Sequence, residues 1–262
     1  MKLKSFKPTS PGVRHKIVIQ KNLLAKDSSL IKNLIKPLKR SYGRSATTGH
    51  ITVWHKGGGV KRRFRSFDSK NKASGSIVLG VFFDPNRNAF ISLNFNVIDK
   101  NFEFSLAPFF VYSGTCLIQN EVLDELILGS RTSLKAIPAG SIIHNIGSLD
   151  NKLGLFSRAA GTFCQLIQKG DKIAKIKLPS NQVVEIPLNY YATLGNVSNI
   201  EHKNTVLGKA GINRLKNKRP TTRGIAMNPV DHPHGGRSNG GQPCATPWGR
   251  PTKGQPTVRR KK

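Results

Sequence analysis

The residues best able to do chemistry lie in a histidine-rich stretch near the C-terminal end, at Asp231, His232 and His234. A His-x-His pair beside an aspartate could bind a metal ion, and His232 could act as a general base near neutral pH. Asp231 is, however, the only acidic residue in 203–262, so the segment offers no second carboxylate for a two-metal nuclease site. The surrounding glycines and basic residues favour RNA binding, and we predict no catalytic residue, no bound metal and no cofactor.

A second cluster joins three consecutive glycines, Gly57, Gly58 and Gly59, to a basic run. Glycine lets a backbone approach a phosphate closely and aim N–H groups at it, and arginine binds phosphate with two hydrogen bonds. The spacing is not that of a nucleotide P-loop, because the second glycine followed by Lys and Ser or Thr is missing. A solvated basic loop is the plain alternative. The flanking rings of Trp54 and Phe64 favour RNA contact, since bases stack on such rings.

Charge is divided unevenly along the chain, which has 262 residues and a formal net charge of +30. Residues 1–72 hold 19 Lys and Arg against 2 acids, residues 73–202 hold 10 of each, and residues 203–262 hold 14 against 1. Two arms this basic repel one another and need a polyanion, for which nucleic acid is the natural choice. A membrane surface is the rival polyanion. It favours an amphipathic helix, which the 9 Gly and 7 Pro of the last 60 residues oppose.

Cys116, Cys164 and Cys244 lie far apart and form no Cys-x-x-Cys pair, which argues against a zinc knuckle. We expect no secretory signal, because the N-terminal residues include no apolar h-region. The odd number of cysteines then suggests reduced thiols, with the first two as small apolar packing residues. The first 26 residues lack acids, so composition alone does not exclude a mitochondrial transit peptide.

Alternating apolar and polar residues predict two sets of short strands in the neutral middle of the chain. In the first set, 91–97 and 102–106 form a hairpin, and 75–83 form a third strand that ends in a turn at 84–86. The second set comprises 141–146, 162–168, 172–178 and 182–187, the last two as a hairpin. Two such sets predict two small barrels and a mainly β fold.

The arms carry little predicted regular structure. Asp27, Ser28 and Ser29 could cap a short helix with Leu30, Ile31, Leu34, Ile35 and Leu38 on one face, the alternative being an extended arm lying on a partner. A second short helix is predicted near 206–215. The rest of the C-terminal arm is rich in turn-forming residues and should order only on RNA, with Trp248 placed on a partner surface or a base.

At these motifs the sequence resembles the universal L-two family of large-subunit ribosomal proteins, nearly from end to end. The resemblance is most specific over 219–236, because that stretch is long and unusual in composition. The other matching segments are 7–12, the glycines 57–59 with their basic run, 84–87, 106–108, 137–141 with His144 and Asn145, 158–162, 192–195 and 207–211.

The resemblance implies an OB-fold barrel followed by an SH3-like barrel, with long basic N- and C-terminal extensions. We expect a basic N-terminal extension at 1–47, an OB-fold RNA-binding domain at 48–127, an SH3-like barrel at 128–202 and an extended RNA-binding tail at 203–262. It also implies a structural constituent of the large ribosomal subunit, near the peptidyl-transferase centre and the subunit interface. The implied partners are large-subunit rRNA, neighbouring ribosomal proteins and the small subunit, with no membrane contact and no homo-oligomer.

In that family the histidine that matches His232 is associated with support of peptidyl transfer, while bond formation is credited to RNA. Residues expected to contact rRNA are His55, Lys56, Gly57, Gly58, Gly59, Lys61, Arg62, Arg63, Arg65, Arg87, Arg158, Lys209, Arg214, Arg219, Arg223, Asn228, Asp231, His232, His234, Arg237, Trp248 and Lys253.

The sequence departs from the family at Trp54, where a basic residue is usual, at Leu215, where an aromatic is common, and over 20–43. The family match begins at Lys7, almost at Met1, which leaves no room for a transit peptide, so we expect a bacterial or organelle-encoded protein. The bias towards Lys, Asn, Ile and Phe resembles an A/T-rich genome. This composition, together with the departures from the family pattern, favours a mitochondrial ribosome over the bacterial cytoplasm.

Two other functions stay open on the residues alone. One is a free-standing RNA chaperone or regulator, which would leave the large subunit in high salt. The other is an RNA-processing enzyme that uses Asp231 and His232.

Overall fold

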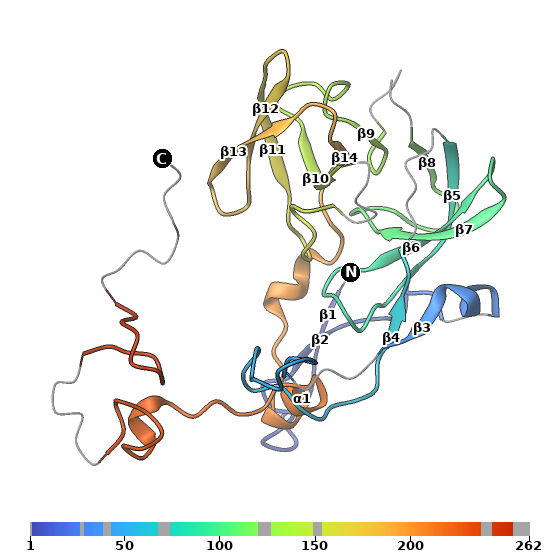
Figure 1. Cartoon of the computed structure of the whole chain (residues 1–262). Helices are drawn as coiled ribbons and strands as arrows, with labels where there is room; N and C mark the ends of the chain where they lie inside the picture. The colour runs from blue at the N-terminus through green and yellow to red at the C-terminus, as the bar shows by residue number, and fades with distance from the viewer. Residues whose placement is uncertain are drawn as a thin grey trace. The chain divides into compact units, whose positions relative to one another are not determined.

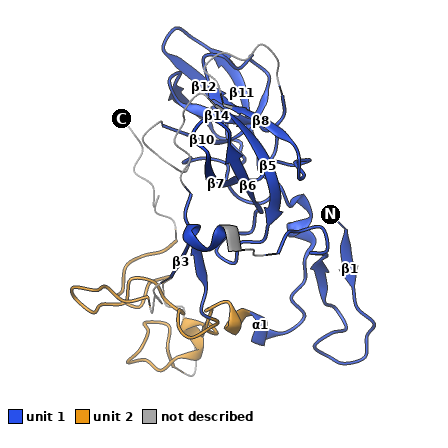
Figure 2. Cartoon of the chain, turned by 90° about the vertical axis from the view of Figure 1, so that its right-hand side faces the viewer, with its two compact units in different colours: residues 1–40, 61–212 blue, residues 41–60, 213–262 orange. Residues whose placement is uncertain are grey.

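A computed structural model of the chain describes residues 2–26, 29–38, 43–67, 74–119, 127–148, 154–236 and 243–253. They fall into two compact units, coloured separately in Figure 2. The first unit comprises residues 1–40 and 61–212, and the second comprises residues 41–60 and 213–262. The second unit is therefore built from an early and a late segment of the chain. Arg237 and the basic run at 259–262 lie outside the described residues.

Four strands form the first barrel of the first unit: β5 (Ser74–Phe82), β6 (Ile91–Asn96), β7 (Asn101–Leu106) and β8 (Cys116–Gln119). Antiparallel pairing joins β5 to β6, β6 to β7 and β5 to β8 (Figure 1). The predicted hairpin and third strand are confirmed. The predicted turn after β5 is confirmed too, because the Asn86 amide donates to Asp84 Oδ1 over 2.9 Å.

Apolar side chains from several elements close the first barrel. Phe82 and Phe104 meet edge to face with ring centroids 6.2 Å apart. The polar side of β6 is buried as well, which differs from the half-buried strand that its alternation predicts. Those side chains bond among themselves: Ser105 Oγ lies 2.8 Å from Ser92 Oγ and accepts from Asn94 Nδ2 over 2.9 Å. The buried core comprises Ile31, Phe67, Phe82, Ile91, Leu93 and Phe104.

The N-terminal part of the first unit is less regular. β1 (Leu3–Ser5) pairs with β2 (Ile17–Ile19), and a 3-10 helix, η1 (Ser29–Leu34), leads into β3 (Ile35–Pro37), which pairs with β4 (Arg63–Arg65). The predicted helix is thus present only as a 3-10 turn. It ends at Leu34 because the next residues pair with β4 instead of continuing the helix. The predicted cap, Asp27 and Ser28, lies outside the described residues.

Six strands form the second barrel: β9 (Arg131–Ser133), β10 (Ile142–Gly147), β11 (Cys164–Lys169), β12 (Ile173–Lys177), β13 (Val183–Pro187) and β14 (Tyr191–Leu194). These strands follow the order β13-β12-β11-β10-β14-β9 in a ten-stranded sheet that continues through β8 into the first barrel. The four predicted strands are confirmed, while β9 and β14 were not predicted. Leu134, Ile137, Ile143, Ile146, Leu166, Ile176 and the buried Cys164 are among the core residues. The mainly β fold is confirmed and is consistent with an OB-fold followed by an SH3-like barrel.

A buried polar row marks the side of the second barrel that faces away from its apolar core. His144 pairs across strands with Thr193, and Thr193 pairs with Arg131. His144 is fully buried, and its Nδ1–H donates to the Gly195 carbonyl oxygen over 2.7 Å. Burial lowers the pKa of His144 to about 4 and that of Arg131 to about 10. A parallel bridge from Gln119 to Arg131 links this row to the first barrel.

Short helical turns follow the barrels: η2 (Ile200–Asn204), α1 (Ala210–Leu215) and η3 (Gly224–Ala226). The predicted helix near 206–215 is confirmed, with shorter bounds. Within the described ranges, no helix is both long and apolar enough to cross a membrane. All three cysteines are free; Cys164 is buried as predicted, and burial raises the pKa of its thiol, whereas Cys116 and Cys244 are exposed.

Candidate nucleic-acid interface

The glycine cluster of the second unit pairs with a basic segment far along the chain. Lys56 and Lys218 form an antiparallel bridge, and the Arg219 amide donates to the His55 carbonyl oxygen over 2.9 Å. The Gly57 amide donates to Asn217 Oδ1 over 2.8 Å. The two paired segments come from the two basic arms of the sequence, and the structure joins them. We call residues 55–60 with 214–219 the glycine clasp.

Glycine is required in the clasp for two physical reasons. Gly57, Gly58 and Gly59 have φ angles of 154°, 71° and 86°, which L side chains rarely adopt. At Gly59 the backbone approach is also very close: a Cβ there would lie 2.8 Å from the Asn217 amide nitrogen and 2.9 Å from the Leu215 carbonyl oxygen. Asn217 itself has φ of 70°, a conformation that asparagine tolerates better than most residues.

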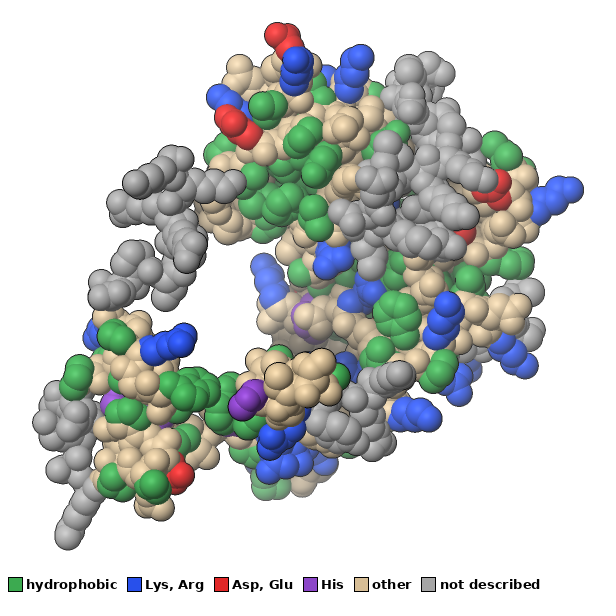
Figure 3. All heavy atoms as spheres, viewed as in Figure 1, with side chains coloured by type: hydrophobic (Ala, Val, Ile, Leu, Met, Phe, Trp, Pro, Cys, Tyr) green, Lys and Arg blue, Asp and Glu red, His purple; other side chains and the backbone are tan. Residues whose placement is uncertain are grey.

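The charge of the second unit is almost entirely positive. Its described residues include nine Lys and Arg and one acid, Asp231. The clasp has five exposed basic residues, namely Lys56, Arg214, Lys216, Lys218 and Arg219. Figure 3, by contrast, shows acidic side chains beside basic ones on the second barrel. A surface with this excess of positive charge over a folded backbone is suited to binding phosphates.

The histidine-rich stretch folds into a tight turn in the second unit. The Asn228 carbonyl oxygen accepts from the amides of Asp231 and His232, and the Gly235 amide donates to the His232 carbonyl oxygen over 2.8 Å. His232 is 8% exposed. Its ring packs on Gly224, where a Cβ would lie 2.7 Å from the ring. The imidazole is therefore held on one face by a residue that must lack a side chain.

Backbone contacts fix both histidines of the turn. The His234 amide donates to His232 Nδ1 over 3.0 Å, so that nitrogen is an acceptor and the proton of neutral His232 sits on Nε2. His234 Nε2 accepts from the Ala245 amide over 3.1 Å and lies 2.9 Å from the Pro243 carbonyl oxygen. These contacts tie the turn to segment 243–253.

Two tryptophans of the second unit pack against each other. The Trp54 and Trp248 ring centroids lie 5.6 Å apart at 61°, and the side chains are 48% and 67% exposed. Trp248 has no apolar neighbours close in the sequence, and the structure shows that its packing partner is Trp54. Enough ring surface stays exposed for a base to stack on it.

The enzyme interpretation of the histidines finds no support in the geometry. His232 Nδ1 is committed to the His234 amide, and Asp231 is exposed. No group of three His, Cys, Asp or Glu residues placed to hold a metal ion occurs in the described part of the chain.

A second basic cluster, in the first unit, is organised by one buried carboxylate. Asp84 is fully buried; its Oδ2 accepts from Arg87 Nε over 2.7 Å, and its Oδ1 lies 3.8 Å from Arg65 Nη1. The Arg87 guanidinium also lies 4.0 Å from the centroid of the Phe67 ring. Arg65 and Arg87 are therefore engaged inside the protein, while the backbone of Arg63 is held by Asn86 and its side chain is exposed.

The two sequence arms also meet in the first unit. Ile17 and Val206 exchange two backbone hydrogen bonds of 3.0 Å. Gly208 packs closely on Gly12, and a Cβ on Gly12 would lie 3.4 Å from Lys209. The Lys16 ammonium lies 5.0 Å from the centroid of the Phe6 ring. The contact places Lys209 beside the N-terminal loop, an arrangement that no local pattern predicts.

The predicted site residues are spread over both units. Seven lie in the first unit, namely Lys61, Arg62, Arg63, Arg65, Arg87, Arg158 and Lys209, and the other described ones lie in the second. The exposed residues are Lys56, Gly58, Lys61, Arg63, Arg158, Lys209, Arg214, Arg219, Arg223, Asn228, Asp231, Trp248 and Lys253. Partly exposed are His55, Gly57, Gly59, Arg62, Arg87 and His234, whereas Arg65 and His232 are buried.

Sequence reasoning missed Lys216, Asn217 and Lys218 of the clasp. Asn217 closes the clasp on Gly57, and Lys218 pairs with Lys56. The available signal was an asparagine between basic residues just after a short helix, which is typical of a left-handed C-terminal position.

Two family models match the chain. The one described as "Ribosomal Proteins L2, RNA binding N-terminal domain" matches residues 31–119, and the one described as "Ribosomal Proteins L2, C-terminal domain" matches residues 128–256. Among full-length relatives, the chain is similar to the large ribosomal subunit protein uL2m of Reclinomonas americana, at 42% identity over 268 residues, which is 100% of this chain and 95% of the relative. It is also similar to the large ribosomal subunit protein uL2 of Rickettsia massiliae (42%) and of Rhodospirillum centenum (40%), each over 100% of this chain and 96% of the relative.

Proposed function

Because this chain belongs to the ribosomal protein L2 family, we propose that it binds large-subunit rRNA chiefly through its second unit, with the glycine clasp as the main anchor. The chain is a structural constituent of the large ribosomal subunit. The observation that carries the proposal is the pairing of the two basic segments, which places five exposed basic residues on one folded backbone. Phosphate contacts of this kind position a protein on RNA, and the Trp54–Trp248 pair supplies a surface for a base.

The buried His232 would then support the peptidyl-transferase region through RNA rather than by chemistry of its own. The ring is held against Gly224 and by the His234 amide, which leaves Nε2–H as its donor. A donor fixed in this way can hold one rRNA acceptor in a single position. The proposal includes support of subunit assembly and of subunit association.

The remaining features follow the same premise. We place the chain as a single copy beside neighbouring ribosomal proteins and the small subunit, with domains at 48–127 and 128–202 between the two extensions. We favour a mitochondrial ribosome over the bacterial cytoplasm. Composition and a mitochondrial relative support that choice, while bacterial relatives at the same identity support the alternative. Finding the gene on an organelle genome would decide between them.

Salt-dependent sedimentation tests the anchor. Arg214→Ala with Arg219→Ala should release the protein from large subunits at lower salt than wild type, because two phosphate contacts are lost. The matched control is Lys175→Ala with Lys177→Ala, which removes the same charge from exposed positions on β12. Equal release of the two double variants would refute the anchor, and complete loss of wild type in high salt would favour an RNA chaperone.

A direct assay tests the enzyme alternative. Purified protein with RNA and a divalent metal should leave the RNA intact. Cleavage that is abolished by His232→Ala would overturn the structural role.

A further inference from the structure

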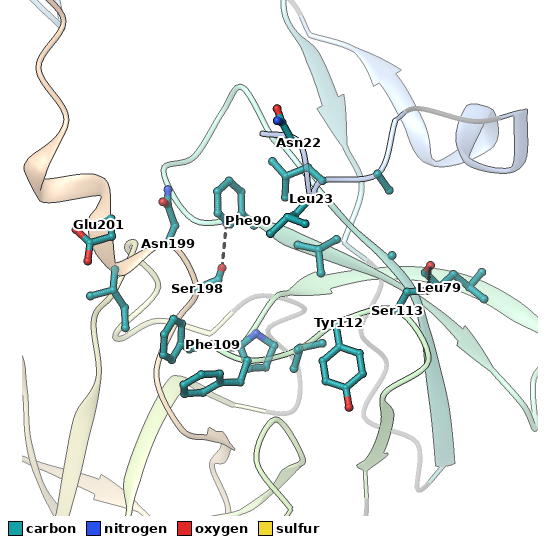
Figure 4. A pocket seen from close by; sticks show the side chains of 18 residues that line it. Asn22, Leu23, Leu79, Phe90, Phe109, Tyr112, Ser113, Ser198, Asn199 and Glu201 are labelled. Atoms are coloured by element: carbon teal, nitrogen blue, oxygen red, sulfur yellow. Dashed lines mark hydrogen bonds between the residues drawn. The ribbon is translucent and has the colours of Figure 1, made fainter. Parts of the chain in front are cut away.

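An open apolar groove of about 880 Å³ lies in the first unit, and none of the residues that line it belongs to the predicted RNA-binding set. Figure 4 shows Leu23 and Phe90 next to each other on one side, with Phe109 and Tyr112 on the other. Two of its walls come from segments 22–25 and 108–113, and residues 79–81, Phe90 and 198–201 complete the lining. The Ala25 amide donates to the Val81 carbonyl oxygen over 2.8 Å, and Ser113 Oγ donates to the Leu79 carbonyl oxygen over 2.7 Å. Both walls are therefore fastened to β5.

The groove exposes large apolar side chains to solvent. Leu23 is 82% exposed, Phe110 75% and Tyr112 72%. Phe110 also has φ of 69°, a left-handed conformation that is rare for a bulky residue and that the fold must hold in place. A smaller apolar hollow, lined by Leu128 and Ile142 among others, shares Phe109 and Phe110 with the groove. The apolar surface thus continues from the first barrel to the second.

The charge of the groove differs from that of the rest of this basic protein. Glu201 is the only charged residue among the eighteen that line it, and no Lys or Arg is among them. RNA affinity depends mainly on phosphate contacts, which this lining does not offer. A second copy is also a poor fit, because its groove is equally acidic and the chain carries a net charge of +30.

We propose that this groove docks an extended apolar segment of a neighbouring protein, and that the segment carries a Lys or Arg that pairs with Glu201. The two walls admit a single chain whose apolar side chains cover Leu23, Phe110 and Tyr112. Glu201 is partly exposed and accepts from Asn204 Nδ2 over 2.6 Å, so its carboxylate is held at the end of the groove. The proposal uses the large subunit as the setting of this contact and so rests on the proposed function.

Photo-crosslinking in assembled large subunits tests the proposal. A diazirine-bearing residue replaces Leu23 in the full-length chain. The control places the same residue at Ile98, which is 67% exposed in the turn after β6 of the same barrel and outside the groove. We expect the Leu23 probe, but not the Ile98 probe, to crosslink to one protein segment that is apolar and contains Lys or Arg. Glu201→Lys should reduce that crosslink at least fivefold.

Each other outcome overturns the proposal. These outcomes are a crosslink to rRNA, to a second copy, to this chain's own residues 254–262 or to an acidic segment, no crosslink, or a crosslink that Glu201→Lys leaves unchanged. Co-sedimentation of both probe variants with the large subunit is measured in parallel. Failure to co-sediment would count against the proposed function, whereas co-sedimentation without the expected crosslink would count against the groove alone.

Discussion

Replacing Gly59 with alanine should weaken rRNA binding by between about a hundredfold and a thousandfold. The left-handed backbone at φ of 86° costs an L residue about 1–2 kcal/mol. The added Cβ would also lie within 3.0 Å of three backbone atoms of Leu215 and Asn217, which must then move away. That movement breaks the bonds from Val60 to Leu215 and from Gly57 to Asn217, each worth about 1 kcal/mol. The total is about 3–4 kcal/mol, and each 1.4 kcal/mol is about tenfold in affinity.

Gly58 supplies the matched control. Its φ of 71° carries a similar strain, but the nearest atom to an added Cβ is the end of the Arg214 side chain at 4.0 Å. Gly58→Ala should therefore lose only about 5- to 30-fold, from about 1–2 kcal/mol of strain. Filter binding of the full-length protein to large-subunit rRNA at one fixed salt concentration measures both. Equal affinities for the two variants, with unchanged melting of the barrels, would refute the role of close backbone packing in the clasp.

Three further substitutions test other parts of the structure. Burial lowers the pKa of His144 from an ordinary 6.5 to about 4, so at pH 5 the unfolded chain binds a proton that the native state does not. The free energy of unfolding should therefore fall by about 2 kcal/mol between pH 7.5 and pH 5. His144→Asn, which keeps a donor for Gly195, should show a smaller fall in melting experiments, and an unchanged fall would contradict the role of His144. Asp84→Asn should lower the free energy of unfolding of the first unit by about 3–5 kcal/mol in urea, because the buried Arg65 loses the carboxylate that it pairs with. The control Asp171→Asn, at an exposed position, should change that free energy by no more than about 0.5 kcal/mol. Gly224→Ala should displace the His232 ring and reduce assembly of active large subunits. The control Gly211→Ala, whose added Cβ meets nothing within 4 Å, should assemble as wild type does. Equal assembly of the two variants would show that the contact between Gly224 and His232 is not needed for assembly.

Most strands of the barrels were predictable because each has a local alternation of apolar and polar residues. The alternation in β6 and β7 and the turn at 84–86 follow from residue type and spacing alone. Strands β9 and β14 were not predicted because they are short and both of their faces are buried or nearly so. A strand of this kind shows no alternation of apolar and polar residues. The helix expected at 29–38 became a 3-10 turn followed by a strand, because pairing with β4 is a tertiary contact that no local pattern records.

The candidate site was predictable in composition but not in geometry. Glycines, arginines and histidines marked the RNA-binding segments, and the family resemblance extended the set. The clasp itself depends on a hydrogen bond between Gly57 and Asn217, which are 160 residues apart. Likewise, the sequence cannot distinguish Arg65, whose guanidinium pairs with a buried carboxylate, from Arg63, whose side chain is exposed. Both differences arise from long-range packing rather than from residue type.

The span of the clasp has a consequence for the order of synthesis. Residues 55–60 are translated early, but they cannot form the clasp until Asn217 and Lys218 have been made, some 160 residues later. At about 5–20 residues per second, that interval is on the order of ten seconds or more. The barrels can close during it, but the clasp cannot. A truncated chain would therefore hold folded barrels without a complete anchor, so a fully formed clasp marks a protein whose synthesis has passed Lys218.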